Sequence, residues 1–381
     1  MSPMIPEGWV QYGKGDPRNV RNPQELMHSR HDETLPLEEQ VKFMADRHRV
    51  LSDFIGYLVD EKDYMENAVE WTGVFPADWT DHFEKILSDT WSFAAEYGYT
   101  DSAEKRLTKR QKKEVIASLK GYCVQEDFDS TLSRLNDHHK KSILETFAKI
   151  YLVKIVVDNF FKHPFWYVEY LPPGAPETCD EAPWQGVSPE GAVLEQMMSR
   201  FEQINPEYGR IWRNLTVRLC NSMYCRLDDD INFGKALAAR RRARCRSLAK
   251  EILSNQTFLS LLKPTDDPAR REEALGSRLV DISDTIVPML SQEPSLELRT
   301  LDELEPKYHH TSKTLEAEWC HFLSQNTDHI PSPRLDGSRV LFIENPFALR
   351  VHTDRDEYIV AMATAVLEDP AGSDAAGKAS K

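Results

Sequence analysis

Histidine and cysteine gather in the C-terminal third of the chain, at His309, His310, Cys320, His321 and His329. Side chains of this kind bind zinc when four donors converge tetrahedrally, usually as close pairs that share one face. Cys320 and His321 are neighbours in the sequence, and neighbouring side chains on a helix point in different directions. We therefore predict surface or core histidines here, with no metal site and no cofactor.

A run of three aspartates, Asp228 to Asp230, superficially resembles the metal-binding acids of helical terpene cyclases. Those enzymes hold magnesium with acids that are separated along a helix, so that several oxygens face one cavity. Here the acids are adjacent, and no second acid lies four residues after Asp228 or Asp229. The run is better explained as an acidic first turn before a basic helix. The sequence also lacks a Walker loop, a dinucleotide glycine pattern and a nucleophile elbow.

Two basic clusters are the positive signals, and they comprise Lys105, Arg106, Lys109, Arg110, Lys112 and Lys113 in the first and Arg240, Arg241, Arg242, Arg244 and Arg246 in the second. Residues 101–120 carry a net charge of +4 and residues 235–250 a net +7, whereas the whole chain carries −15. Such runs match short nuclear-import signals or phosphate-contact surfaces. The alternative is a solvated helix face that pairs with the protein's own acids.

The overall composition limits the partners and the compartment. A charge of −15 argues against general coating of nucleic acid. No 18-residue run is free of charge, and the N-terminus lacks a basic and an apolar signal region, so we expect neither a membrane span nor a secretory signal. Six scattered cysteines are typical of a reducing compartment. We predict nuclear or cytoplasmic localisation, or both.

The element expected to organise the chain is the segment 143–161, which is apolar on nearly every side of a helical wheel. A helix of this kind is buried. Its charges are spaced as two pairs four residues apart, Glu145 with Lys149 and Lys154 with Asp158. Pro164 is expected to end it.

Other elements follow from periodicity and capping signals. We predict an amphipathic helix from Leu37 to about Val59, a capping box from Thr108 to Gln111, and proline-started helices after Ser188, Asn205 and Asp267. A basic helix is expected from about Phe233 to Leu253, and another helix from about Ser312. Near the C-terminus, 340–343 and 347–351 read as short extended runs, with a final strand or helix after Asp356.

Together these elements predict a mainly α fold, a multi-helix orthogonal bundle around a buried central helix with a small extended or β piece near the C-terminus. The expected division is an irregular arm over 1–35, helical subdomains over 36–170 and 188–368, a Pro-rich loop or linker over 171–187, and a disordered tail over 369–381.

The segment 147–169, FAKIYLVKIVVDNFFKHPFWYVE, resembles a segment of uncharacterised all-helical proteins of filamentous fungi. In general character it is also similar to the nuclear hypoxia-responsive morphology factors and their subtelomeric relatives. The shared pattern is an apolar helix that ends in an aromatic and proline motif. Because this motif serves packing, the resemblance assigns no functional residue. The resemblance implies regulation of gene expression and of colony or biofilm morphology.

Three functions remain open at this point. The first is a non-enzymatic regulatory or adaptor protein, nuclear at least part of the time, that acts through protein partners such as an import receptor. The second is an enzyme with a helical cavity and dispersed active-site residues, for which Tyr151, Lys154 and Asp158 are the buried polar candidates. The third is a nucleic-acid-binding protein that uses both basic clusters.

Overall fold

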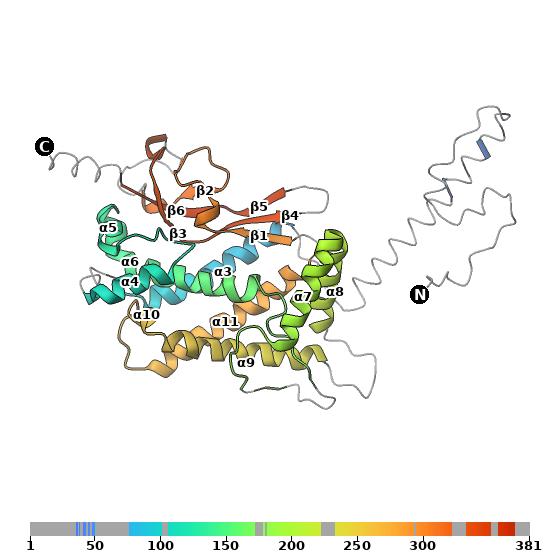
Figure 1. Cartoon of the computed structure of the whole chain (residues 1–381), viewed down its shortest axis with the longest axis horizontal. Coiled ribbons are helices and arrows are strands. Elements are labelled where there is room, and N and C mark those ends of the chain that lie inside the picture. The colour runs from blue at the N-terminus through green and yellow to red at the C-terminus, as the bar shows by residue number, and fades with distance from the viewer. Residues whose placement is uncertain are drawn as a thin grey trace. The chain divides into compact units, whose positions relative to one another are not determined.

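The computed structural model describes residues 76–100, 106–171, 178–179, 181–221, 233–292, 295–321, 333–351 and 357–369, with a few isolated positions between 36 and 49 (Figure 1). The chain divides into two compact units, Met1–Thr72 and Gly73–Lys381. In the first unit Glu38, Val41 and Ala45 are helical, in agreement with the helix expected from Leu37. The arm over 1–35, the aspartates 228–230 and the tail after 369 lie outside the described residues.

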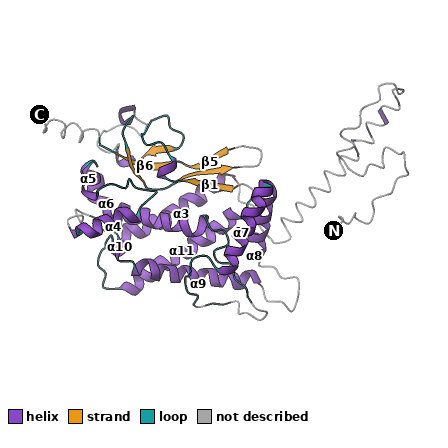
Figure 2. Cartoon of the chain, viewed as in Figure 1, coloured by secondary structure: helices purple, strands orange, loops and turns teal. Residues whose placement is uncertain are grey.

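Helices dominate the second unit, as the sequence predicts, and Figure 2 shows them on one side with the strands gathered on the other. They are α3 (Pro76–Tyr97), α4 (Lys109–Ser118), α5 (Phe128–Ser133), α6 (Asp137–Val156), α7 (Pro189–Ile204), α8 (Pro206–Cys220), α9 (Phe233–Ser254), α10 (Gln256–Leu259) and α11 (Pro268–Leu290). A π-helical turn, Val157–Phe161, continues α6.

The predicted helix starts are confirmed. The Thr108 and Gln111 side chains form both halves of a capping box at α4. Ser188 and Asp267 each accept a backbone N–H of the helix that follows, and proline occupies the next position in both cases. The Asn205 side chain accepts the Tyr208 N–H at 3.2 Å. Each cap satisfies an N–H group that the helix itself cannot bond.

Helix α6 buries side chains over most of its length, as its sequence pattern predicts. Phe147 packs between Phe128 of α5 and Phe342, with ring centroids 5.9 and 5.5 Å away. The predicted pair of Lys154 with Asp158 is present, at 2.5 Å. Lys149 instead bonds the Glu344 carboxylate at 2.6 Å, and both side chains are buried. The helix is therefore tied to the C-terminal sheets by a charged hydrogen bond as well as by apolar contact.

The C-terminal region forms two three-stranded sheets, in the orders β1–β4–β5 and β2–β6–β3. The strands are β1 (Ser295–Arg299), β2 (Leu315–Ala317), β3 (Val340–Ile343), β4 (Phe347–Val351), β5 (Glu357–Ala361) and β6 (Ala363–Leu367). The extended runs 340–343 and 347–351 and the element after Asp356 are confirmed as strands. Both sheets lie over the side of the helices that includes α3 and α6 (Figure 1).

The helix predicted from Ser312 is wrong. Leu315–Ala317 is a strand that pairs in parallel with β6, and Trp319–His321 is a single 3₁₀ turn. The apolar spacing of Leu315 and Trp319 suited a helix, but pairing with β6 overrides that local preference. The strand and the turn, in place of a helix, set the directions of Glu318, Cys320 and His321.

Helices from before and after the Pro-rich segment share one core, since α11 packs on both α3 and α9. The chain divides at 72/73, and the segment 171–187 lies inside the second unit. Aromatic residues next to that segment are buried, including Phe165, Trp166 and Tyr167.

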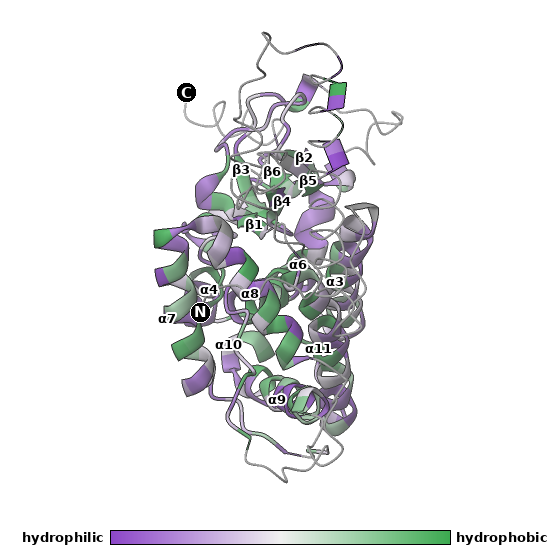
Figure 3. Cartoon of the chain, turned by 90° about the vertical axis from the view of Figure 1, so that its right-hand side faces the viewer, coloured by the Kyte–Doolittle hydropathy of each residue, from purple (hydrophilic) through white to green (hydrophobic). Residues whose placement is uncertain are grey.

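The α7–α8 hairpin carries exposed apolar side chains, which are Val193, Met197, Ile204, Tyr208, Ile211 and Leu219. Figure 3 shows apolar residues along the outer side of α7. Among the described helices, none has both the length and the apolar character that crossing a membrane requires.

Candidate functional site

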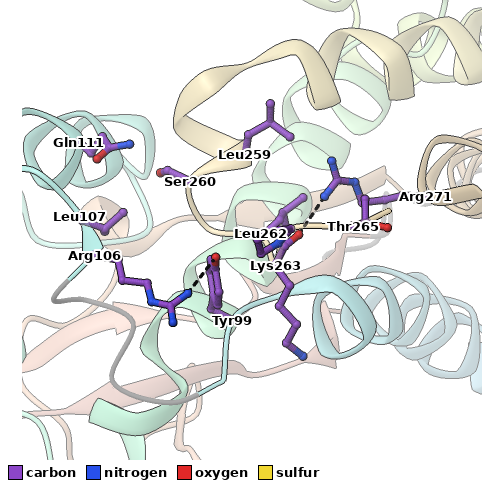
Figure 4. Close-up of a pocket in the computed structure, with 11 residues that line it drawn as sticks. Tyr99, Arg106, Leu107, Gln111, Leu259, Ser260, Leu262, Lys263, Thr265 and Arg271 are labelled. Carbon is purple, nitrogen blue, oxygen red and sulfur yellow. Dashed lines mark hydrogen bonds between the residues drawn. The ribbon is translucent and has the colours of Figure 1, made fainter. Parts of the chain in front are cut away.

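A pocket of about 310 Å³ opens where the end of α3, the start of α4 and the α10–α11 connection meet (Figure 4). Its lining residues are Tyr99, Arg106, Leu107, Gln111, Leu259, Ser260, Leu262, Lys263, Pro264, Thr265 and Arg271. The volume lies at the lower end of the range for small-molecule sites.

Backbone pairing holds two walls of the pocket together. Gly98 and Leu262 form an isolated antiparallel bridge, the Tyr99 N–H donates to the Leu261 carbonyl at 3.1 Å, and the Lys263 N–H donates to the Tyr97 carbonyl at 2.8 Å. A side chain at Gly98 would collide with the Ala94 carbonyl and the Glu145 backbone, so this close approach requires glycine.

Three cations line the pocket, and its eleven lining residues include no carboxylate. Arg106 donates to the Tyr99 hydroxyl at 3.4 Å, and its guanidinium lies 5.4 Å from the centre of that ring. Arg271 donates to the Lys263 carbonyl at 3.1 Å, as Figure 4 shows. Burial lowers the pKa of Arg271, and its Nε is buried without a hydrogen-bond partner among the described residues. The lining of the pocket is therefore cationic, with the three charged groups on different parts of it (Figure 4).

The first basic cluster continues from this pocket onto the surface of α4. Lys109, Arg110 and Lys113 are exposed, and Arg110 pairs with Glu114 one turn away at 2.7 Å. Lys112 is turned inward, where it bonds Asp129 at 2.5 Å and lies 5.3 Å from the Phe128 ring centre. Lys105 lies outside the described residues. Within the described part of this cluster, Arg106 lines the pocket and Lys112 links α4 to α5. Lys109, Arg110 and Lys113 form an exposed face.

The second basic cluster, on α9, is largely paired with the protein's own acids. Arg241 and Arg244 are buried, and Arg240 and Arg244 both bond Glu169, at 2.7 and 3.4 Å. Arg241 and Arg242 both bond Asp284 of α11, at 2.5 and 2.8 Å.

Arg241 and Arg244 also hold the aromatic segment that follows α6. Arg244 donates to the Trp166 carbonyl at 2.9 Å, and Arg241 lies over the Tyr167 ring while it donates to the Asn221 side chain at 2.7 Å. Burial raises the pKa of Tyr167 to about 12. Arg246 is exposed. The buried arginines are structural in this fold, and we do not assign them to phosphate contact.

Of the three polar candidates for an active site, Tyr151 is buried as predicted, whereas Lys154 and Asp158 are only half-buried. Tyr151 stacks on Phe258 at 4.8 Å, and burial raises the pKa of its hydroxyl. Lys154 and Lys162 both bond Asp158, at 2.5 and 2.7 Å. Although burial alone would raise the pKa of Asp158, these two lysines lower it. None of the three candidates lines the pocket shown in Figure 4.

The histidines and cysteines fall into two places. His309 and His310 stack at 4.9 Å beside Asp336, which His310 bonds at 2.7 Å. Cys320 and His321 are buried on the 3₁₀ turn after Glu318. His329 lies outside the described residues.

Glu318 meets His139 of α6, which the sequence analysis did not single out. Burial alone would raise the pKa of Glu318, but bonds from His139 and from the Cys320 N–H lower it. Burial, together with the Glu318 carboxylate, raises the pKa of the Cys320 thiol.

Lys263 and Arg271 of the pocket were also missed, because no local spacing links them to Arg106. The sequence did contain one signal for the position of Arg271. Asp267 and Pro268 mark a helix start, and this start places Arg271 in the first turn of α11. Comparisons of the chain with protein-family models, with curated proteins and with solved structures gave no significant match.

Proposed function

We propose that this chain is a non-enzymatic regulatory or adaptor protein, nuclear for at least part of the time, whose α4 binds an import receptor with an acidic surface. One observation carries the proposal. In an acidic chain, α4 presents Lys109, Arg110 and Lys113 to solvent, while the second cluster is largely paired internally. A concentrated cationic face attracts an acidic partner and speeds its docking.

The helical form of this face bears on the mode of binding. The capping box of Thr108 with Gln111 stabilises the first turn of α4, typically by about 1 kcal/mol. A receptor that reads an extended segment would have to unwind that turn, so we propose that α4 docks as a helix. The regulatory role in gene expression and colony or biofilm morphology rests on the resemblance of segment 147–169. We also retain the interpretation of the fold as an orthogonal bundle around α6.

Localisation of a fluorescent fusion tests this proposal. The triple variant Lys109→Ala, Arg110→Ala, Lys113→Ala removes the exposed face without touching buried groups. A matched control, Lys120→Ala, Lys141→Ala, Lys250→Ala, removes the same charge from scattered exposed positions. We expect nuclear signal in the wild type and in the control, and its loss in the α4 triple. An equal distribution in all three proteins contradicts the proposal.

A second candidate function is the binding of a small phosphate-bearing ligand in the pocket of Figure 4, favoured by its three cations and by the buried Arg271 Nε. Titration calorimetry with pyrophosphate tests it. Lys263→Gln should weaken binding about tenfold, whereas Lys250→Gln, on an exposed part of α9, should not. If only a single-stranded oligonucleotide binds, with a steep dependence on salt, nucleic-acid binding replaces this candidate.

A further inference from the structure

A cluster of three metal-ligating side chains lies between the start of α6 and the turn after β2, away from the cationic pocket. The Nε2 or Nδ1 atom of His139, a carboxylate oxygen of Glu318 and the Sγ atom of Cys320 all lie within 4.8 Å of one another. The three residues are 3, 4 and 8% exposed. We propose that His139, Glu318 and Cys320 form a binding site for one zinc ion, or for a divalent transition-metal ion of similar preference.

Hydrogen-bond partners fix the orientation of the His139 ring, as is usual for a metal-binding imidazole. Its Nδ1 lies 2.9 Å from the Asn136 side-chain oxygen, which also accepts the His139 backbone N–H at 2.9 Å. Its Nε2 therefore points at Glu318, 2.8 Å away. Metal-bound histidines regularly donate the other ring N–H to an oxygen, which fixes the ring and its tautomer. Asn136 performs that task here, in addition to capping α6.

The rest of the cluster also limits movement. The Cys320 N–H donates to the Glu318 carboxylate at 2.8 Å, which holds the acid and the thiol on one turn. His321 packs on His139 with ring centroids 4.7 Å apart, and its Nε2 accepts the Leu367 N–H at 2.9 Å. His321 thus packs against one side of the site, and its Nε2 is already occupied by a hydrogen bond.

The donor set and its charge suit zinc. One imidazole nitrogen, one carboxylate oxygen and one thiolate sulfur are the three ligand types that zinc takes in proteins. Such donors lie roughly 3 to 4 Å apart around the ion, so the His139 to Glu318 contact has to open by less than about 1 Å. Without the ion, the two His139 ring nitrogens face the side-chain oxygens of Asn136 and Glu318.

Binding of the ion requires the thiolate form of Cys320. One Zn²⁺ enters and the Cys320 thiol proton leaves to solvent, so the two positive charges of the ion meet the two negative charges of the Glu318 carboxylate and the Cys320 thiolate. That balance matters because an uncompensated charge in a buried position is costly. The second His and Asp group, His309, His310 and Asp336, is a weaker candidate. It contains no thiol, and His309 has a side chain that is 60% exposed.

The test is a titration of the metal-stripped full-length chain with cobalt(II), followed by displacement with zinc. We expect one equivalent to bind with a thiolate-to-cobalt charge-transfer band, release of the Cys320 thiol proton measured by calorimetry in two buffers, and a higher unfolding temperature with zinc. Absence of the charge-transfer band, or a zinc dissociation constant weaker than about 1 µM, overturns the proposal.

Variants locate the ion. Cys320→Ser should remove the charge-transfer band and weaken binding about 100-fold, whereas Cys179→Ser and His310→Asn should keep both. If His310→Asn abolishes binding while Cys320→Ser leaves it unchanged, the ion belongs to the other group and the proposal is wrong. Folding of each variant is checked by circular dichroism. The wild-type titration decides the question if Cys320→Ser does not fold.

Discussion

The two basic clusters look alike in the sequence and have opposite environments in the fold. In α4, Lys109, Arg110 and Lys113 are exposed. In α9, Arg241 and Arg244 are buried and bond acids, a backbone carbonyl and a side-chain amide. The difference teaches that the density of charge in a segment does not determine its exposure. What distinguishes α9 is arginine, whose rigid planar group carries several donors that can satisfy several buried acceptors at once.

The largest effect is expected from removing a buried arginine. Arg241→Met leaves the Asn221 oxygen and one Asp284 oxygen without their donor, so unfolding should become easier by about 3 kcal/mol or more. The matched change in the exposed cluster, Lys113→Met, should alter stability by less than about 0.5 kcal/mol. Urea unfolding followed by circular dichroism measures both. Similar losses in the two variants would remove the distinction between the clusters.

A conservative exchange sharpens the same contrast. Arg241→Lys keeps the charge but replaces the two separate nitrogens that donate to Asn221 and Asp284 with a single ammonium nitrogen, and a loss of about 1 to 2 kcal/mol is expected. Arg110→Lys should leave the urea midpoint unchanged within error, because a solvent-exposed ion pair contributes little. An Arg241→Lys protein as stable as the wild type would show that charge alone suffices in α9.

Thiol labelling compares the two environments without changing a charge in α9. Cys245 lies inside the second cluster, fully buried, and burial raises its pKa to about 12. Its alkylation should require global unfolding and should therefore be far slower than that of an exposed thiol at both pH 7 and pH 8. A cysteine introduced by Lys113→Cys should react at once, with a rate that rises almost tenfold over that pH step. Mass spectrometry of labelled peptides reads both sites, and rapid labelling of Cys245 in the native protein would contradict the buried assignment.

A small effect is expected at the tether between α4 and α5. Lys112→Gln removes the bond to Asp129, whose side chain is 60% exposed, and the contact with Phe128. We expect a loss of stability of about 0.5 kcal/mol, between those of Lys113→Met and Arg241→Lys. A double-mutant cycle with Asp129→Asn measures the pair itself. A coupling of zero would place Lys112 with the exposed residues of its cluster.

The parts of the fold that could be predicted from the sequence are those fixed by nearby residues. Thr108 with Gln111, and the strands 340–343 and 347–351, follow from short-range rules. In α9 a signal was present, because Arg241 and Arg244 keep the helical spacing of buried Leu237 and Leu248. This spacing places the two arginines on the same face as the two leucines, which is the buried face of the helix.

The sites could not be predicted in the same way. The pocket unites Arg106 with Lys263 and Arg271 through the bridge of Gly98 and Leu262, and pairings between distant segments leave no local pattern. The error at Ser312 had the same origin, since the pairing of Leu315 with Ala363 decides the structure there. The prediction that Cys320 and His321 point in different directions assumed a helix, and the structure has a 3₁₀ turn there.

The charged bond from Lys149 to Glu344 has a consequence for synthesis on the ribosome. The partners are 195 residues apart, and His139 is 179 residues from Glu318. At typical translation rates α6 emerges roughly ten to forty seconds before the acids that neutralise its inner face. During that interval the nascent helix exposes both its apolar surface and the unpaired Lys149 ammonium, so a chaperone would protect it at this stage.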